Sequence, residues 1–175
     1  MANPAIPRDQ VHSLAEACGD AGDEFQSTAT RLIKEQRRLS RFFEQNVQAM
    51  GPMPTQVSLY MLSVVLRIFD QMGGRMKKIN GQDLQTAMQK VQAGTEALMP
   101  ADDTFMERAK TVEWRAQPHI LDEVLWALYE REDEEVNDGE VDLEASSSAL
   151  VYMMLWTAVE ALDAGWTPPS GWSPE

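Results

Sequence analysis

The stretch VSLYMLSVVLRIF, residues 57–69, decides the fold class of this protein. Its apolar residues recur at spacings of three and four and cover nearly the whole circumference of a helix. Pro54 suits the first turn of such a helix, and Gly73 and Gly74 suit its end. Because a helix that is apolar on almost every side must be surrounded by other elements, the stretch predicts a central, buried helix over residues 55–72.

The same spacing extends over most of the chain, and strict alternation of apolar and polar residues is not sustained anywhere. The sequence therefore predicts an all-α, single-domain bundle of about six or seven helices within residues 1–165. A Pro-, Gly- and Ser-rich tail, residues 166–175, is expected to lack regular structure. The other helices are expected at residues 8–18, 24–50, 80–98, 104–115, 119–132 and 143–164. Asn80 and Asp83 have the spacing of a capping box.

The apolar faces of three of these helices predict where the core lies. Its expected centre consists of Leu62, Val65, Leu66, Phe69, Leu125, Leu128, Leu155 and Val159. Trp166 and Trp172 come after the last predicted helix, and tryptophan side chains rarely remain in water. We expect the tail to fold back over the helices.

Length and composition place the chain among ordinary globular domains. It has 175 residues, of which 43% are hydrophobic, and this suits one domain. A single cysteine, Cys18, excludes an intramolecular disulfide and suits a reducing compartment. The sequence shows neither a signal peptide nor an apolar stretch that would span a bilayer. These features predict a cytoplasmic protein without a membrane partner.

The net charge of −13 is distributed unevenly along the chain. Residues 1–100 contain 11 Lys and Arg against 10 Asp and Glu, whereas residues 101–175 contain 4 against 18. A negative field of this size repels nucleic acid and anionic membranes and favours basic protein surfaces or cations. Acidity also keeps a protein soluble.

The predicted helix 24–50 carries a basic ridge on the side opposite its apolar stripe. The ridge consists of Arg31, Lys34, Arg37, Arg38 and Arg41. Because no aromatic or Gly-rich platform accompanies these cations, nucleic acid is a poor candidate partner. The acidic stretch 130–144, from the same chain or a second copy, is the favoured one. The sequence thus predicts a protein partner, including a homodimer formed through this long helix.

The acidic stretch YEREDEEVNDGEVDLE, residues 129–144, resembles a calcium loop only in part. Asp133, Glu135, Asn137 and Glu144 occupy ligand positions 1, 3, 5 and 12. The sixth position, where the loop requires glycine for its sharp turn, is Asp138, and the glycine comes one residue later. A solvated connection that acts through its charge is the favoured interpretation.

Two pairs of carboxylates, Glu132-x-x-Glu135 and Glu160-x-x-Asp163, suggest a different chemistry. Their arrangement is similar to the ExxE…ExxD pattern of the all-α nucleotide pyrophosphohydrolases, the MazG-like family. The resemblance implies that the four carboxylates hold Mg²⁺ against the phosphates of a nucleotide during hydrolysis. It covers only these four residues.

Histidines and nucleophiles add little to the functional prediction. His12 and Glu16, like His119 and Glu123, stand one helical turn apart, a spacing that suits either a metal site with Asp9 and Asp122 or ordinary ion pairs. Ion pairs are favoured. The chain contains no GxSxG motif and no glycine-rich phosphate loop, and Cys18 has no basic neighbour in the sequence.

Together these patterns favour a protein-interaction or regulatory protein with an acidic C-terminal half. We assign it no catalytic residue, no cofactor and no small-molecule substrate. Two alternatives remain: a Mg²⁺-dependent nucleotide pyrophosphohydrolase that uses Glu132, Glu135, Glu160 and Asp163, and an acidic binder that neutralises a basic protein.

Overall fold

A computed structural model of the chain, which describes residues 3–100, 102, 104–130 and 145–174, confirms the all-α fold. Two 3₁₀ turns, Gln48–Met50 and Glu96–Leu98, and a π-helical turn, Trp126–Glu130, supplement the α-helices. None of the described helices is long and apolar enough to cross a lipid bilayer. In chain order the helices are α1 (Arg8–Asp20), α2 (Asp23–Glu35), α3 (Arg37–Val47), α4 (Pro52–Met72), α5 (Gly81–Thr95), α6 (Phe105–Lys110), α7 (Pro118–Leu125) and α8 (Ala145–Gly165).

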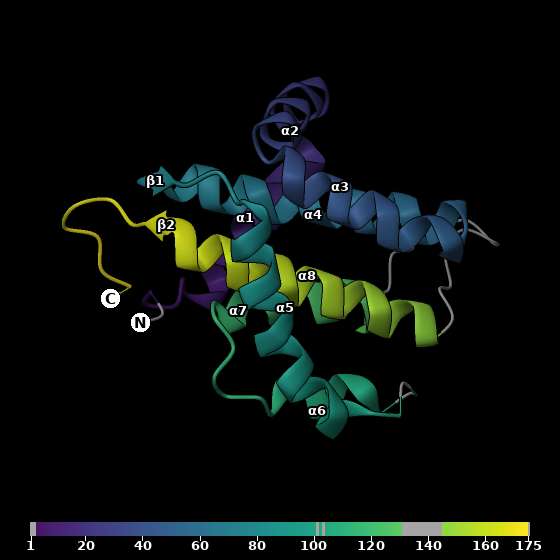
Figure 1. Ribbon diagram of the computed structural model, residues 1–175. Coiled ribbons are helices and arrows are strands. Elements are labelled where there is room, and N and C mark those ends of the chain that lie inside the picture. The colour runs from purple at the N-terminus through teal and green to yellow at the C-terminus, as the bar shows by residue number, and fades with distance from the viewer. Residues whose placement is uncertain (1–2, 101, 103, 131–144, 175) are drawn as a thin grey trace.

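Two long helices, α4 and α8, lie side by side at the centre of the molecule (Figure 1). Helices α1, α2 and α3 pack against α4, and α5 and α7 pack against α8. Seven of the eight residues predicted at the centre of the core are buried, and Leu128 is half-buried. The sequence predicted one central helix, but α8 shares that position, since its residues from Val151 to Asp163 are buried almost without interruption.

The prediction of one helix over residues 24–50 is wrong, because the chain bends at Gln36 between α2 and α3. Gln36 is buried, and its side-chain amide donates to Lys77 O and accepts from Ile79 N, both at 2.9 Å. A buried amide must find such partners. Ser40 Oγ donates to Ile33 O, one of the carbonyls near the bend, at 3.0 Å. As a result α2 projects from the body while α3 runs along it (Figure 1).

The predicted capping box at the start of α5 is confirmed. Asn80 Oδ1 accepts from Asp83 N at 2.9 Å, and Asp83 Oδ2 accepts from Asn80 N at 3.0 Å. This pair satisfies two backbone N–H groups at the beginning of the helix, so α5 starts where the sequence places it.

Two other predicted helices are shorter than expected. The helix predicted at 104–115 ends at Lys110, where the buried Arg115 side chain turns back and donates to Val112 O at 2.9 Å and to Lys110 O at 3.4 Å. An arginine side chain that hydrogen-bonds the last carbonyls in this way stabilises the end of a helix. The helix predicted at 119–132 is regular only to Leu125 and continues as the π-helical turn.

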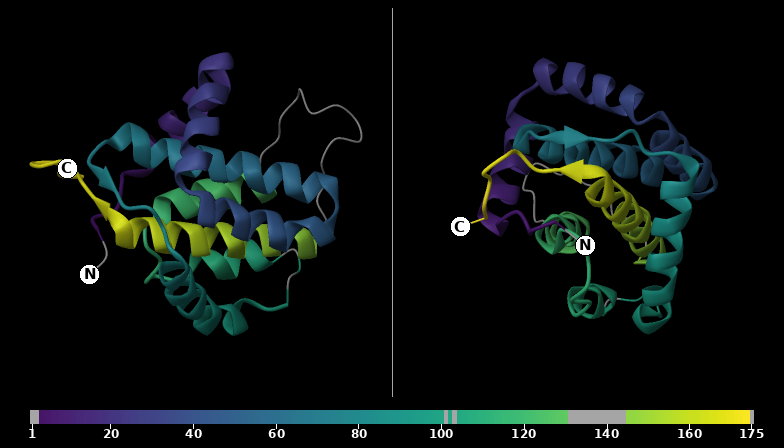
Figure 2. Two further views of the ribbon diagram at one scale, coloured as in Figure 1. Left: turned by 45° about the horizontal axis from the view of Figure 1, so that its top comes forward. Right: turned by 60° about the vertical axis from the view of Figure 1, so that its left-hand side comes forward.

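The tail folds back onto the helices, as Trp166 and Trp172 suggested. Its first residues are regular rather than irregular: β2 (Trp166–Thr167) pairs antiparallel with β1 (Arg75–Met76) beyond the ends of α8 and α4 (Figure 2). Trp166 is buried against Phe69, with ring centroids 5.3 Å apart, and its Nε1 donates to Gly73 O. Gly74 has φ of +79°, and a Cβ atom there would lie 2.2 Å from Thr167 O, so only glycine fits.

Candidate functional site

Glu160 of α8 is a buried structural anchor in the described part of the chain. Its side chain is 2% exposed. Oε2 accepts from Ala116 N at 2.7 Å and from Trp156 Nε1 at 3.1 Å, and Oε1 lies 2.9 Å from Lys90 Nζ. These contacts join α8 to α5 and to the connection between α6 and α7.

Asp163, one turn further along α8, anchors the N-terminal segment. Its carboxylate accepts from Asn3 N at 3.2 Å and from Gln117 Nε2 at 2.9 Å. Gln117 in turn accepts from Ile6 N and donates to Pro4 O, so its amide lies between the N-terminal segment and α8. Gln117 has φ of +47°, and these hydrogen bonds hold its backbone in the left-handed region.

The E-x-x-D spacing of Glu160 and Asp163 is thus accounted for by the fold, because each of their four carboxylate oxygens contacts a donor from the protein itself. Glu132 and Glu135, and the calcium-loop positions 133–144, lie outside the described residues. Within the described part, no three His, Cys, Asp or Glu side chains converge as metal ligands. The resemblance to the pyrophosphohydrolases gains no support from Glu160 and Asp163, and it stays a prediction.

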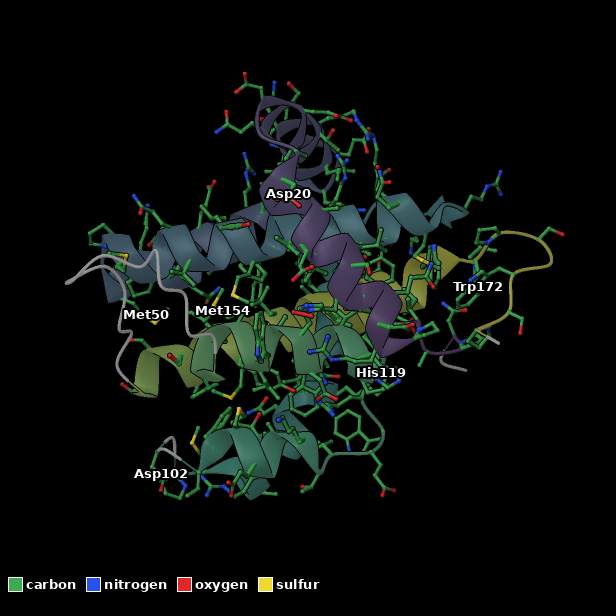
Figure 3. The ribbon with its side chains drawn as sticks, turned by 180° about the vertical axis from the view of Figure 1, so that it is seen from behind. Asp20, Met50, Asp102, His119, Met154 and Trp172 are labelled. Carbon is green, nitrogen blue, oxygen red and sulfur yellow. The ribbon has the colours of Figure 1, made fainter. Side chains whose placement is uncertain are left out.

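The two histidines are placed differently from each other. His12 Nε2 lies 3.0 Å from Glu16, which confirms that ion pair. Glu123 does not pair with His119 but with His12, whose Nδ1 lies 2.8 Å from Oε1, and with Arg8. These contacts join α1 to α7, which α1 crosses in Figure 3. His119 Nδ1 is buried and has no hydrogen-bond partner in the described structure.

The His12 contact predicts a pH-dependent contribution to stability. The hydrogen bond that His12 donates to the Glu123 carboxylate raises the pKa of His12 above its ordinary value of 6.5, and burial and Arg8 oppose this only in part. The stabilisation by protonated His12 is therefore fully present below about pH 6.5 and is lost as pH rises through the raised pKa. We expect His12→Gln to destabilise the protein modestly at pH 5.5, with the difference disappearing at alkaline pH. Urea unfolding across this range measures it.

Glu123→Gln provides the independent check on this contact. The substitution removes the charge that stabilises the imidazolium, so the pKa of His12, followed by NMR, is expected to fall relative to the wild type. A pKa of His12 that is unchanged in this variant would contradict the assignment.

An open groove of about 690 Å³ lies between the end of α1, α2 and α4. Its apolar lining includes Phe25, Ala29, Ile33 and Tyr60, and Cys18 borders it. Cys18 is buried, its thiol donates to Leu14 O, and burial raises its pKa despite the charge of Arg67. A raised pKa keeps the thiol protonated, which is its less nucleophilic form.

The bend at Gln36 divides the predicted basic ridge. Arg31 and Lys34 lie on α2, where Arg31 pairs with Glu35 of the same helix and with Asp70 of α4, at 3.2 and 3.3 Å. The remaining three arginines lie on α3, are exposed, and pair with no acid in the described structure. The sequence also predicts that the acidic stretch 130–144 contacts this ridge. Residues 131–144 lie outside the described residues, so that contact stays a prediction.

Two of the α3 arginines line a second groove, between α3 and α5, which we call the α3–α5 groove. Its volume is about 550 Å³. Phe42 is half-buried and Met88 is 45% exposed, so both provide apolar surface there, whereas Leu84 is buried. Helices α3 and α5 lie on the near side of the bundle in Figure 1. The residues that line the groove are Arg38, Arg41, Phe42, Gln45, Gly81, Leu84, Gln85, Met88, Gln89 and Gln92.

The chemistry of the α3–α5 groove is that of a recognition surface. Arginine presents a fork of N–H donors that fits a carboxylate, and the four glutamines can both donate and accept hydrogen bonds. Methionine is flexible and adapts to irregular apolar surfaces. None of the lining residues is acidic. The groove therefore suits a ligand that combines carboxylates with apolar groups.

Part of this site was not singled out from the sequence. The arginines belong to the predicted basic ridge, but the α5 residues do not. Gln85, Gln89 and Gln92 recur at helical spacing beside Met88, which places an amide-rich stripe on one face of α5. This stripe is the feature of the sequence from which the α5 side of the groove could have been predicted.

Comparisons with protein families, with curated proteins and with solved structures found no match.

Proposed function

We propose that this protein is an interaction protein that binds acidic, amphipathic protein segments in the α3–α5 groove. One observation carries the proposal: Arg38 and Arg41 are exposed, without acid partners among the described residues, beside the exposed apolar side chain of Met88. We place this activity in a reducing compartment such as the cytoplasm, which suits the single, protonated thiol of Cys18.

The combination of charge and apolar surface supports a protein ligand over other classes. An exposed ion pair contributes only about 0 to 1 kcal/mol. Binding must also use the apolar surface of Phe42 and Met88, at about 25 cal/mol for each Å² removed from water. Nucleic acid would require many more phosphate contacts than two arginines provide, on a chain of net charge −13.

The proposal predicts that a peptide of alternating Glu and Leu binds, whereas the same peptide with Lys for Glu binds at least about tenfold more weakly. Fluorescence anisotropy of labelled peptides at low salt measures both affinities. We expect Arg38→Glu/Arg41→Glu to weaken binding of the acidic peptide at least about tenfold, since each substitution replaces an attraction by a repulsion.

The matched control for this prediction is Arg37→Glu/Arg75→Glu. It changes the net charge equally at two exposed arginines outside the groove, and we expect it to leave binding nearly unchanged. Met88→Ala should weaken binding at low and high salt alike, because an apolar contact is not screened. Equal affinities for the groove and control variants would reject the α3–α5 groove as the site.

A further inference from the structure

We infer that the occupant of the α3–α5 groove is residues 131–144 of a second copy of this chain. The inference rests on the proposed function, because it names the partner of the same groove. The groove has two arginines without acid partners among the described residues, and residues 131–144 of the chain are rich in carboxylates.

The composition of residues 131–144 matches the lining of the groove. The segment contains eight carboxylates and one arginine in fourteen residues, together with Val136, Val141 and Leu143. Residues 140–144, EVDLE, alternate carboxylates with apolar side chains. Carboxylates suit Arg38 and Arg41, and the valines and leucine suit the apolar surface at Met88.

Two-fold symmetry favours a second copy as the source of the segment, because a contact between two symmetry-related copies is made twice. In the sequence, residues 131–144 lie between the π-helical turn that continues α7 and the start of α8. In a pair of copies related by a two-fold axis, each groove receives the segment of the other copy. This exchange closes a dimer and places the acidic part of each copy against the basic part of its partner.

Sedimentation velocity of the full chain over a range of concentrations tests the inference. We expect a concentration-dependent dimer at about 20 mM NaCl that dissociates at about 500 mM NaCl, because salt screens the ion pairs. Arg38→Glu/Arg41→Glu should raise the dissociation constant of the dimer at least about tenfold. Arg37→Glu/Arg75→Glu, with the same net charge, should not raise it.

Mixing two variants with reversed charges tests the inference most directly. Mixing the Arg38→Glu/Arg41→Glu protein with Glu140→Lys/Asp142→Lys protein should form a mixed dimer through the Glu–Lys contacts, although each variant alone stays monomeric. Lack of rescue would overturn the inference, as would a dimer that resists the groove variant.

The two proposals fail in different ways. If the full chain is monomeric at every concentration but still binds the acidic Glu/Leu peptide, the second copy is excluded and the proposed function stands. If neither the peptide nor a second copy binds, the proposed function fails as well. A monomer whose Arg38→Glu/Arg41→Glu variant binds the peptide no differently from the wild type also rejects the groove.

Discussion

Replacing Glu160 by alanine is expected to lower the free energy of unfolding by about 3 to 5 kcal/mol. The substitution leaves two buried donors, Ala116 N–H and Trp156 Nε1–H, without their acceptor, and each unsatisfied donor costs about 1 to 3 kcal/mol. Losing the ion pair with Lys90 adds little to the free-energy change, because the Lys90 side chain is 51% exposed and its ammonium group is hydrated instead. Urea unfolding followed by circular dichroism measures the change.

Two further variants separate the anchoring role of Glu160 from the effect of removing a charge. Glu44→Ala removes an exposed helical carboxylate on α3 and should change stability by less than about 0.5 kcal/mol. Glu160→Gln keeps an acceptor oxygen for the buried donors and should cost less than the alanine variant. A loss below about 1 kcal/mol for Glu160→Ala would contradict the anchoring role and make the carboxylate available for a ligand.

The parts of the fold that the sequence predicted are those specified by local signals. The apolar circumference of residues 57–69 produced α4, and the Asn80–Asp83 spacing produced the cap of α5. Tail tryptophans after a glycine indicated a segment that folds back. In each case the deciding residues lie within a few turns of one another, so periodicity and capping rules suffice.

The bend at Gln36 could not be predicted in this way because its cause lies far along the chain. The amide of Gln36 bonds to residues 41 and 43 positions away, Lys77 and Ile79. From the sequence alone, a glutamine within an amphipathic run is a good helix former. Only the tertiary contact makes it a buried polar group whose hydrogen bonds override that preference.

Several donors to Glu160 and Asp163 are also distant in the sequence. The two residues have the spacing of a metal-binding pair, but three of their donors come from Ala116, Gln117 and Asn3, between 44 and 160 residues away. A spacing rule cannot distinguish a carboxylate that holds a loop from one that holds an ion. The α3–α5 groove likewise depends on two helices that are separate in the sequence.

Burial removes several of the carboxylates of residues 101–175 from the protein surface. Glu123, Glu160 and Asp163 are buried and bonded to protein donors, so their carboxylate oxygens are not available to a binding partner. Residues 131–144 contain eight further carboxylates, which we propose bind the α3–α5 groove of a second copy.

Leu66→Ala is expected to lower the free energy of unfolding by about 2 to 5 kcal/mol, the range for emptying a buried leucine site. Leu66 is 4% exposed on α4, within the core formed with α8. The loss combines the transfer of apolar atoms with the cost of a cavity that the long, packed helices cannot close. Chemical denaturation of the full chain, with tryptophan fluorescence and circular dichroism as probes, measures the change.

Leu150→Ala is the matched control for this substitution, because Leu150 lies on α8 with its side chain 45% exposed. The same atoms are removed from a site already open to water, so the change should stay within about 0.5 kcal/mol. Equal losses for the two variants would show that α4 is not buried as described. A large loss for Leu150→Ala alone would instead indicate that a partner covers this face of α8, since water would then no longer reach the leucine.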